Sequence, residues 1–149
     1  MVPIQTLLGI GGSAAFATFI LTSGLLDAGA APGRGPPPGG CNYSGTSQTG
    51  TNGPDTLIGT PFRDLLNGKG GDDTIEGRGC PDQLIGEGGN DIISGGEGND
   101  ALTGATGNDR LTGGPGADLF SCGPGTDTVT DFNAAEGDRL ADKSCETVL

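Results

Sequence analysis

The chain of 149 residues contains no histidine and no tryptophan, and its basic residues are few. Without histidine there is no Ser-His-Asp or Cys-His arrangement, and the usual zinc ligands are missing. Seven Lys and Arg against 19 Asp and Glu give a formal net charge of −12. We therefore expect no nucleic-acid partner, because no basic patch is available to meet phosphates.

Material for an ordinary hydrophobic core is also scarce. Aromatic residues make up 4% of the chain and hydrophobic residues 32%, whereas 32 of the 149 residues are glycine. Such a composition is, by itself, typical of disordered protein. A strict internal period argues against disorder here, because a disordered chain has no reason to keep one.

That period is nine residues long and runs from residue 50 to residue 130. The repeated aspartates are Asp55, Asp64, Asp73, Asp82, Asp91, Asp100, Asp109, Asp118 and Asp127. Two positions after them stand Leu57, Leu66, Ile75, Leu84, Ile93, Leu102, Leu111, Phe120 and Val129. Five positions before each aspartate stands a glycine, except at Cys122. Three columns in register indicate a solenoid.

Each repeat combines a turn with a very short strand. Its first six residues are rich in Gly, Asn and Pro, and glycine at the first and fourth places allows a positive φ. Its last three residues direct one apolar side chain inward. This pattern predicts an all-β solenoid of parallel sheets, capped by residues 131–149, where the period breaks. Further burial is expected from Ile58, Leu65, Ile85, Ile92 and Leu119.

If two repeats form one coil, the aspartates fall into two columns at opposite edges. One column contains Asp55, Asp73, Asp91, Asp109 and Asp127, and the other contains Asp64, Asp82, Asp100 and Asp118. Neighbouring carboxylates would lie ~4.8 Å apart and repel by roughly 3 kcal/mol at an effective dielectric near 20. Ca²⁺ prefers oxygen ligands, which carboxylates and turn carbonyls supply. The gaps between turns allow at most seven calcium sites, and we expect the repeats to be largely unfolded without calcium.

Repeats such as GEGGNDIIS (86–94) and GATGNDRLT (104–112) resemble the RTX, or haemolysin-type, calcium-binding nonapeptide family, with the pattern G-G-x-G-x-D-x-U-x, where U is large and apolar. The resemblance implies a right-handed parallel β-roll with calcium between turns, held by the sixth-place aspartate and by turn carbonyls. The side-chain ligands that it implies are Asp73, Asp82, Asp91, Asp100, Asp109, Asp118 and Asp127.

The first repeats depart from this pattern. Asp55 and Asp64 are weaker candidates, and Phe62 replaces a fourth-place glycine, so we expect the turn at 59–64 to bind calcium poorly or not at all. Cys80 and Pro81 are expected to disturb the turn before Asp82. The strongest turns are expected between residues 86 and 121.

The residues before the repeats predict export. Residues 1–30 are expected to be a signal peptide cleaved after Ala30, although the uncharged stretch 1–26 is also long enough for an uncleaved anchor. Residues 31–49 form a Pro/Gly-rich linker and a segment that leads into the repeats. Either reading places the repeats outside the cytoplasm, secreted or at the cell surface. No membrane partner is evident after cleavage, and the sequence does not identify a protein or glycan partner.

Four cysteines follow the proposed cleavage site, an even number that fits disulfides in an oxidising compartment. Three connectivities are possible, and free thiols are the alternative. We favour Cys122–Cys145, which would tie the cap to the last turn, and Cys41–Cys80, which would tie the leading segment to the roll.

The sequence thus predicts a secreted, non-catalytic calcium-binding protein, with surface coating, adhesion, calcium buffering or protection as its candidate roles. A structural, surface-binding solenoid that does not depend on calcium is the first alternative. A hydrolase with paired carboxylates is the second, but catalysis needs one privileged pair, and no aspartate stands out from its column.

Overall fold

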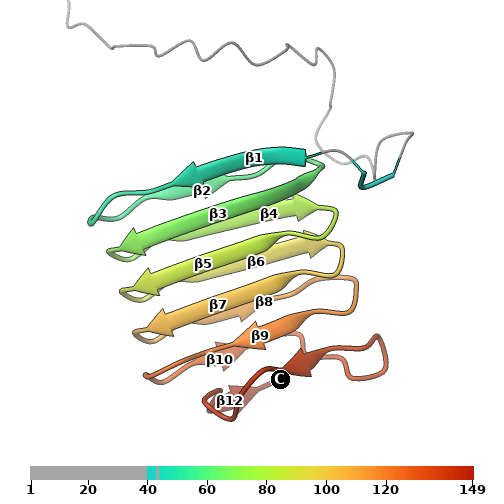
Figure 1. Cartoon of the computed structure of the whole chain (residues 1–149). Coiled ribbons are helices and arrows are strands. Elements are labelled where there is room, and N and C mark those ends of the chain that lie inside the picture. Colours follow the sequence, from blue (N-terminus) through green and yellow to red (C-terminus); the bar gives the residue numbers. More distant parts are fainter. Residues whose placement is uncertain (1–39, 43) are drawn as a thin grey trace, which may run out of the picture.

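The computed structural model describes residues 40–42 and 44–149, and within them all regular structure is β-strand (Figure 1). The expected signal peptide or anchor, and the linker as far as residue 39, lie outside the described residues. No helix long and apolar enough to cross a membrane occurs in the part that is described.

In the described residues, twelve strands form two parallel sheets that face each other across a narrow core. The first sheet has the order β1-β3-β5-β7-β9-β11 and the second β12-β10-β8-β6-β4-β2. The first sheet contains β1 (Ser44–Thr49), β3 (Arg63–Gly70), β5 (Gln83–Gly88), β7 (Ala101–Thr106), β9 (Leu119–Ser121) and β11 (Arg139–Leu140). The second contains β2 (Thr56–Ile58), β4 (Thr74–Gly79), β6 (Ile92–Glu97), β8 (Arg110–Thr112), β10 (Thr128–Val129) and β12 (Thr147–Val148). The chain is a β-solenoid, and two repeats make one turn of this β-roll.

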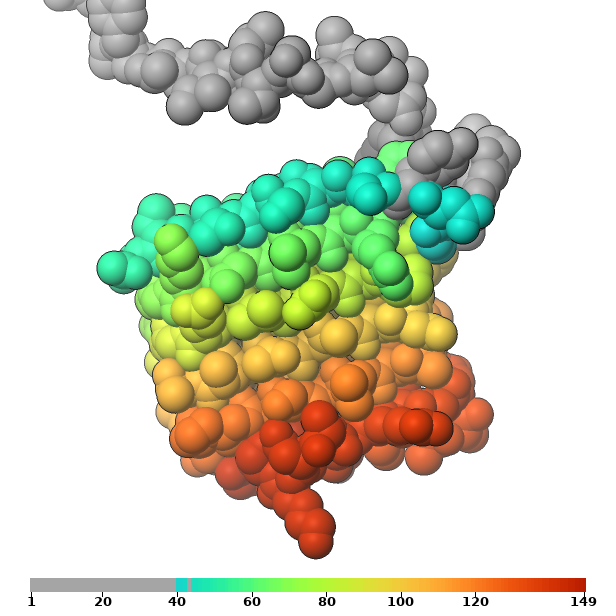
Figure 2. All heavy atoms as spheres, viewed as in Figure 1, coloured from blue at the N-terminus to red at the C-terminus, as the bar shows by residue number. Residues whose placement is uncertain are grey.

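The register confirms the period of two repeats for each turn. Leu66 pairs with Leu84, and Leu84 pairs with Leu102, each eighteen residues further on. The turns therefore stack as successive bands from the first repeat to the C-terminus (Figure 2). The last strands continue both sheets with longer steps, since Arg139 pairs with Leu119 and Thr147 pairs with Thr128.

All nine apolar residues of the repeat lie inside the roll. The buried core contains Leu57, Leu66, Ile75, Leu84, Ile93, Leu102, Leu111, Phe120, Cys122 and Val129, with Phe132 and Cys145 packed against it. The expected contribution from flanking residues is mostly wrong: Ile58, Leu65, Ile92 and Leu119 are 42–53% exposed. They follow or precede an inward residue, and successive side chains of a strand point to opposite faces of its sheet.

Alanine substitutions of two adjacent leucines on β3 test how much this thin core contributes to the free energy of unfolding. Leu66 is 0% exposed and Leu65 is 43% exposed. We expect Leu66→Ala to lower the free energy of unfolding by about 2–5 kcal/mol through loss of contacts and a cavity. Leu65→Ala should change it by no more than about 0.5 kcal/mol. Urea unfolding in saturating calcium measures both, and equal effects would contradict the inward and outward assignment.

Candidate metal centre

The turns between strands owe their shape to left-handed residues at the second and fourth places of the repeat. From the third repeat on, the second-place residues with positive φ are Lys69, Arg78, Glu87, Gly96, Ala105, Gly114 and Gly123. The fourth-place residues with positive φ are Gly71, Cys80, Gly89, Gly98, Gly107, Gly116 and Gly125. The first-place glycines do not have a positive φ, so the prediction of such a φ at the first place is wrong.

The first-place glycine instead makes room for oxygen atoms. A Cβ on Gly95 would lie 2.6 Å from the carbonyl oxygen of Gly113, one turn further on, and closer still to Oδ2 of Asp100. A Cβ on Gly77 would meet Asp82 Oδ2 and the Gly95 carbonyl in the same way. A carboxylate oxygen and a carbonyl oxygen therefore converge beside each of these glycines.

The repeated aspartates are buried in two columns along the two edges of the roll. Asp64, Asp73, Asp82, Asp91, Asp100, Asp109, Asp118 and Asp127 are at most 4% exposed, and Asp55 is half-buried. From Asp73 onward each carboxylate of a column accepts, through Oδ1, a hydrogen bond from the backbone N–H of the aspartate one turn earlier. The Asp82 N–H donates to Asp100 over 2.8 Å, and the Asp91 N–H donates to Asp109 over 2.8 Å. One oxygen of each carboxylate is thus satisfied by the backbone.

The second carboxylate oxygen has no partner in seven of these residues. Buried Oδ2 atoms without a hydrogen bond belong to Asp73, Asp82, Asp91, Asp100, Asp109, Asp118 and Asp127. These are the same seven residues that the family resemblance implies as ligands. A buried, unpaired carboxylate oxygen is costly, because hydrogen bonding or a counter-charge has to replace its lost hydration.

Asp55 and Asp64 differ, because a threonine four residues earlier satisfies their Oδ2 atoms. Thr51 donates to Asp55 Oδ2 from its backbone N–H over 2.6 Å and from its hydroxyl over 2.9 Å. Thr60 donates to Asp64 Oδ2 from the same two groups, over 2.6 and 3.2 Å. The sequence pattern did not reveal this arrangement, although threonine at the second place of both repeats was a visible signal.

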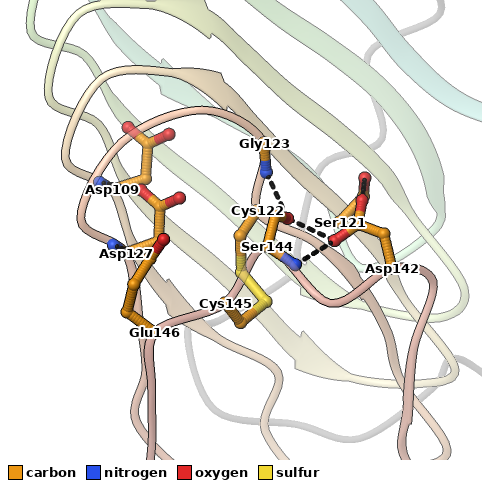
Figure 3. Close-up of a disulfide and its surroundings, with 9 residues drawn as sticks. All are labelled: Asp109, Ser121, Cys122, Gly123, Asp127, Asp142, Ser144, Cys145 and Glu146. Atoms are coloured by element: carbon orange, nitrogen blue, oxygen red, sulfur yellow. Dashed lines mark hydrogen bonds between the residues drawn. A yellow bond between two sulfur atoms is a disulfide. The ribbon is translucent and has the colours of Figure 1, made fainter.

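Two acidic residues of the C-terminal segment extend the columns and escaped the sequence reasoning. Asp138, 7% exposed, accepts the Asp118 N–H over 2.9 Å, and Glu146 accepts the Asp127 N–H over 2.7 Å. Figure 3 shows Asp109, Asp127 and Glu146 one below another, to the left of the Cys122–Cys145 disulfide. A local signal existed, since Asp138-Arg139-Leu140 copies the tripeptide at 109–111 and the tripeptide at 146–148 resembles that at 127–129.

Burial makes ionisation of these carboxylates unfavourable. It raises the pKa of Asp82 from 3.8 to about 7, with the charges of Asp100 and Asp64 adding to the effect and the hydrogen bond from the Asp64 N–H opposing it. Burial likewise raises the pKa of Asp91, Asp100 and Asp118 to about 6. The pKa values of Asp109 and Asp127 are raised for the same reason. A positive ion beside the columns would reverse this preference.

The turn before Asp82 keeps the geometry of its neighbours, so the expectation that Cys80 and Pro81 disturb it is wrong. Cys80 adopts the left-handed φ of 69° that the fourth place requires, and Asp82 Oδ2 is buried and unpaired. The structure joins Cys80 to Cys41, with Cα atoms 5.4 Å apart, and Cys122 to Cys145, with Cα atoms 5.2 Å apart. These are the two pairings that the sequence analysis favours.

A comparison with family models finds the RTX calcium-binding nonapeptide repeat, in four copies, at residues 49–79, 81–102 and 95–129. The chain belongs to the RTX calcium-binding nonapeptide repeat family. Comparisons with curated proteins and with solved structures found no match.

The donor set of these RTX repeats fits calcium in its chemistry. Among the described residues no three Asp, Glu, Cys or His side chains converge into a cluster, because each turn contributes one carboxylate to each edge. Ca²⁺ is bound by carboxylates together with backbone carbonyls, and it tolerates irregular geometry. The unpaired Oδ2 atoms and the carbonyls beside the first-place glycines are oxygens of these two kinds. Zinc prefers nitrogen and sulfur, and all four cysteines are in disulfides.

Proposed function

We propose that this chain is a secreted calcium-binding solenoid whose repeats fold when calcium occupies their turns. The observation that carries the proposal is the set of seven buried carboxylates with an unpaired Oδ2 atom. We assign Asp73, Asp82, Asp91, Asp100, Asp109, Asp118 and Asp127 as the side-chain ligands, with first-place glycine carbonyls as further donors. This assignment allows at most seven ions for each chain.

The charge balance around the columns supports a cation as their partner. The described part of the chain contains one ion pair, Arg78–Glu76, and both side chains are exposed. No cation of the described residues forms an ion pair with a column carboxylate, although the Arg63 charge favours ionisation of Asp82. Backbone N–H groups satisfy only one oxygen of each buried carboxylate, and a buried charge without a counter-charge is strongly destabilising.

Export is supported by the two disulfides. Such bonds form and persist in oxidising compartments and are rare in the cytosol. They join both ends of the roll to neighbouring turns, as expected for a domain that works outside the cell. We therefore place the protein outside the cytoplasm, secreted or at a cell surface.

The carboxylates support a binding role in preference to catalysis. Asp82, Asp91 and Asp100 share one environment: each is buried, each receives one backbone N–H, and each has a free Oδ2. A hydrolase separates its two carboxylates into an acid and a base by giving them different surroundings. A repeated environment gives several equivalent binding sites, which suits a non-catalytic calcium protein.

Calcium titrations of the wild type and of variants at the adjacent residues Asp72 and Asp73 test this function. In wild-type protein we expect far-UV circular dichroism to show little β-structure without calcium and a cooperative gain on its addition. Asp73→Asn keeps a carbonyl oxygen for the Asp55 N–H but loses the charge, so calorimetry should count about one ion fewer. Asp72→Asn is the matched control, because Asp72 is exposed and its bond to the Asn90 N–H needs only a carbonyl oxygen. Identical wild-type spectra with and without calcium would contradict the proposal.

A further inference from the structure

The second place of the repeat adopts two different conformations in this roll. From Lys69 onward every second-place residue has a positive φ, whereas Thr51 and Thr60 do not. A positive φ is a strained conformation for a β-branched residue. Threonine at this place therefore favours a different turn from the one that lysine, arginine, glutamate, alanine and glycine adopt.

The change of conformation redirects the second-place N–H. In a later turn the Ala105 N–H donates to the Cys122 carbonyl in the next turn, over 2.8 Å, and the Gly96 N–H donates to Gly113 in the same way. The Thr51 N–H instead donates to Asp55 Oδ2 within its own turn. The same N–H therefore either leaves the carboxylate open or closes it.

The threonine hydroxyl completes the closure. The Thr51 hydroxyl donates to Asp55 Oδ2 and accepts the Gly53 N–H over 3.2 Å, and the Thr60 hydroxyl accepts the Phe62 N–H over 3.2 Å while donating to Asp64. Hydroxyl bridges of this kind stabilise turns without a ligand. Donors to an ionised carboxylate are also among the stronger hydrogen bonds in proteins.

The first turn otherwise has the oxygen arrangement of the open turns. A Cβ on Gly50 would lie 2.7 Å from Asp55 Oδ2 and 2.5 Å from the Gly68 carbonyl. The glycine, the carboxylate and the next-turn carbonyl are thus in place, and the residue that differs is Thr51. Its repeat reads GTNGPD, which a single glycine would convert to the family pattern GGNGPD.

We propose that threonine at the second place of a repeat closes the glycine-rich loop of that repeat to calcium. The first two repeats, at residues 50–58 and 59–67, would then form a calcium-independent start of the roll. The inference rests on the proposed function for the identity of the ion, and it adds the residue that decides which turns receive one. The Cys41–Cys80 disulfide links the segment just before β1 to the turn after β4, at the edge that also contains the closed turn of Asp64. Calcium would then extend a structure whose first turns are already held by hydrogen bonds and a covalent link.

Reciprocal variants test the proposal by counting bound calcium in calorimetric titrations. Thr51→Gly should add about one ion for each chain, and Ala105→Thr, placed in an open turn, should remove about one. Thr51→Ser keeps the hydroxyl and should leave the count unchanged. Unaltered counts in both reciprocal variants, with calcium bound by the wild type, would overturn the inference and leave the proposed function standing.

Amide hydrogen exchange without calcium gives a second, independent result. We expect slower exchange at residues 50–64 than at residues 68–127, because only the first two turns have satisfied carboxylates. Absence of calcium binding by the wild type would overturn the proposed function, whereas the exchange pattern tests the closed turns by themselves. Equal or reversed protection of the two regions would overturn the calcium-independent start.

Discussion

We expect Gly77→Ala to lower the free energy of unfolding by about 3 kcal/mol, the upper end of what overpacking typically costs, and to remove calcium from one turn. The new Cβ would lie 2.6 Å from the Gly95 carbonyl and closer still to Asp82 Oδ2. The carbonyl belongs to the backbone of the next turn, so the clash cannot be relieved by a side-chain rotation. Because the same Cβ fills the space between two proposed donor oxygens, stability in calcium should suffer more than stability without it.

Gly79→Ala, two residues further along β4, is the matched control. Its nearest heavy atom would be the Pro61 Cα at 3.7 Å, and Gly79 does not have a positive φ. Alanine there reduces the freedom of the unfolded chain, so a gain of about 0.4–1 kcal/mol is expected. Thermal unfolding in calcium compares the two variants. Similar losses in both would mean that the first-place glycine is needed for backbone freedom and not for space.

Strict periodicity made the architecture and most of the site predictable from sequence. A step of eighteen residues sends Asp82 and Asp100 to the same edge and Leu84 and Leu102 to the same core column, whatever the turn conformation. The inward residue follows from the alternation of side chains in a strand. The column partners and the core therefore required no knowledge of individual contacts.

The orientation of the peptide groups within each turn cannot be predicted in the same way. The ladder from each aspartate N–H to the next carboxylate, as from Asp73 to Asp91, depends on how the peptide planes are oriented. A stack of carboxylates in a sequence predicts simple repulsion, although one oxygen of each is hydrogen-bonded here. Glycine at the first place predicts a positive φ equally poorly, because glycine has two distinct uses, conformational freedom and lack of volume.

The C-terminal segment, residues 131–149, shows a different limit of prediction from a fixed repeat. Asp138 and Glu146 continue the two columns at steps of twenty and nineteen residues, so a search at fixed intervals does not find them. The role of Thr51 and Thr60 is not visible in the sequence, because threonine in a turn predicts neither an open nor a closed carboxylate until its hydroxyl and N–H are placed. Asp138 and Glu146 break the exact spacing and keep the hydrogen bond of the column. Thr51 and Thr60 keep the spacing and change the hydrogen bonds of their turns.

The calcium-free roll should lose stability as pH rises, and the calcium-loaded roll should gain it. Without calcium, burial raises the pKa of Asp82 to about 7 and that of Asp91, Asp100 and Asp118 to about 6, against 3.8 for an ordinary aspartate. A carboxyl whose pKa is raised in the fold contributes its stability fully below pH 4 and loses it as pH rises through 6 to 7. One pKa unit corresponds to about 1.36 kcal/mol, so each raised carboxyl disfavours the ionised roll by about a few kcal/mol. Small domains have little stability to lose, so such a cost is large for this roll.

Calcium reverses the sign because it binds the ionised carboxylate. Its affinity, and with it the stability of the loaded roll, should rise over the same interval in which the calcium-free form weakens. Circular dichroism between pH 4 and pH 8 should therefore show β-structure fading with rising pH in calcium-free buffer, whereas the melting temperature in excess calcium should rise. Magnesium at equal concentration is the control, since it demands stricter octahedral geometry and is dehydrated reluctantly. The same pH dependence with and without calcium would contradict calcium binding by the ionised columns.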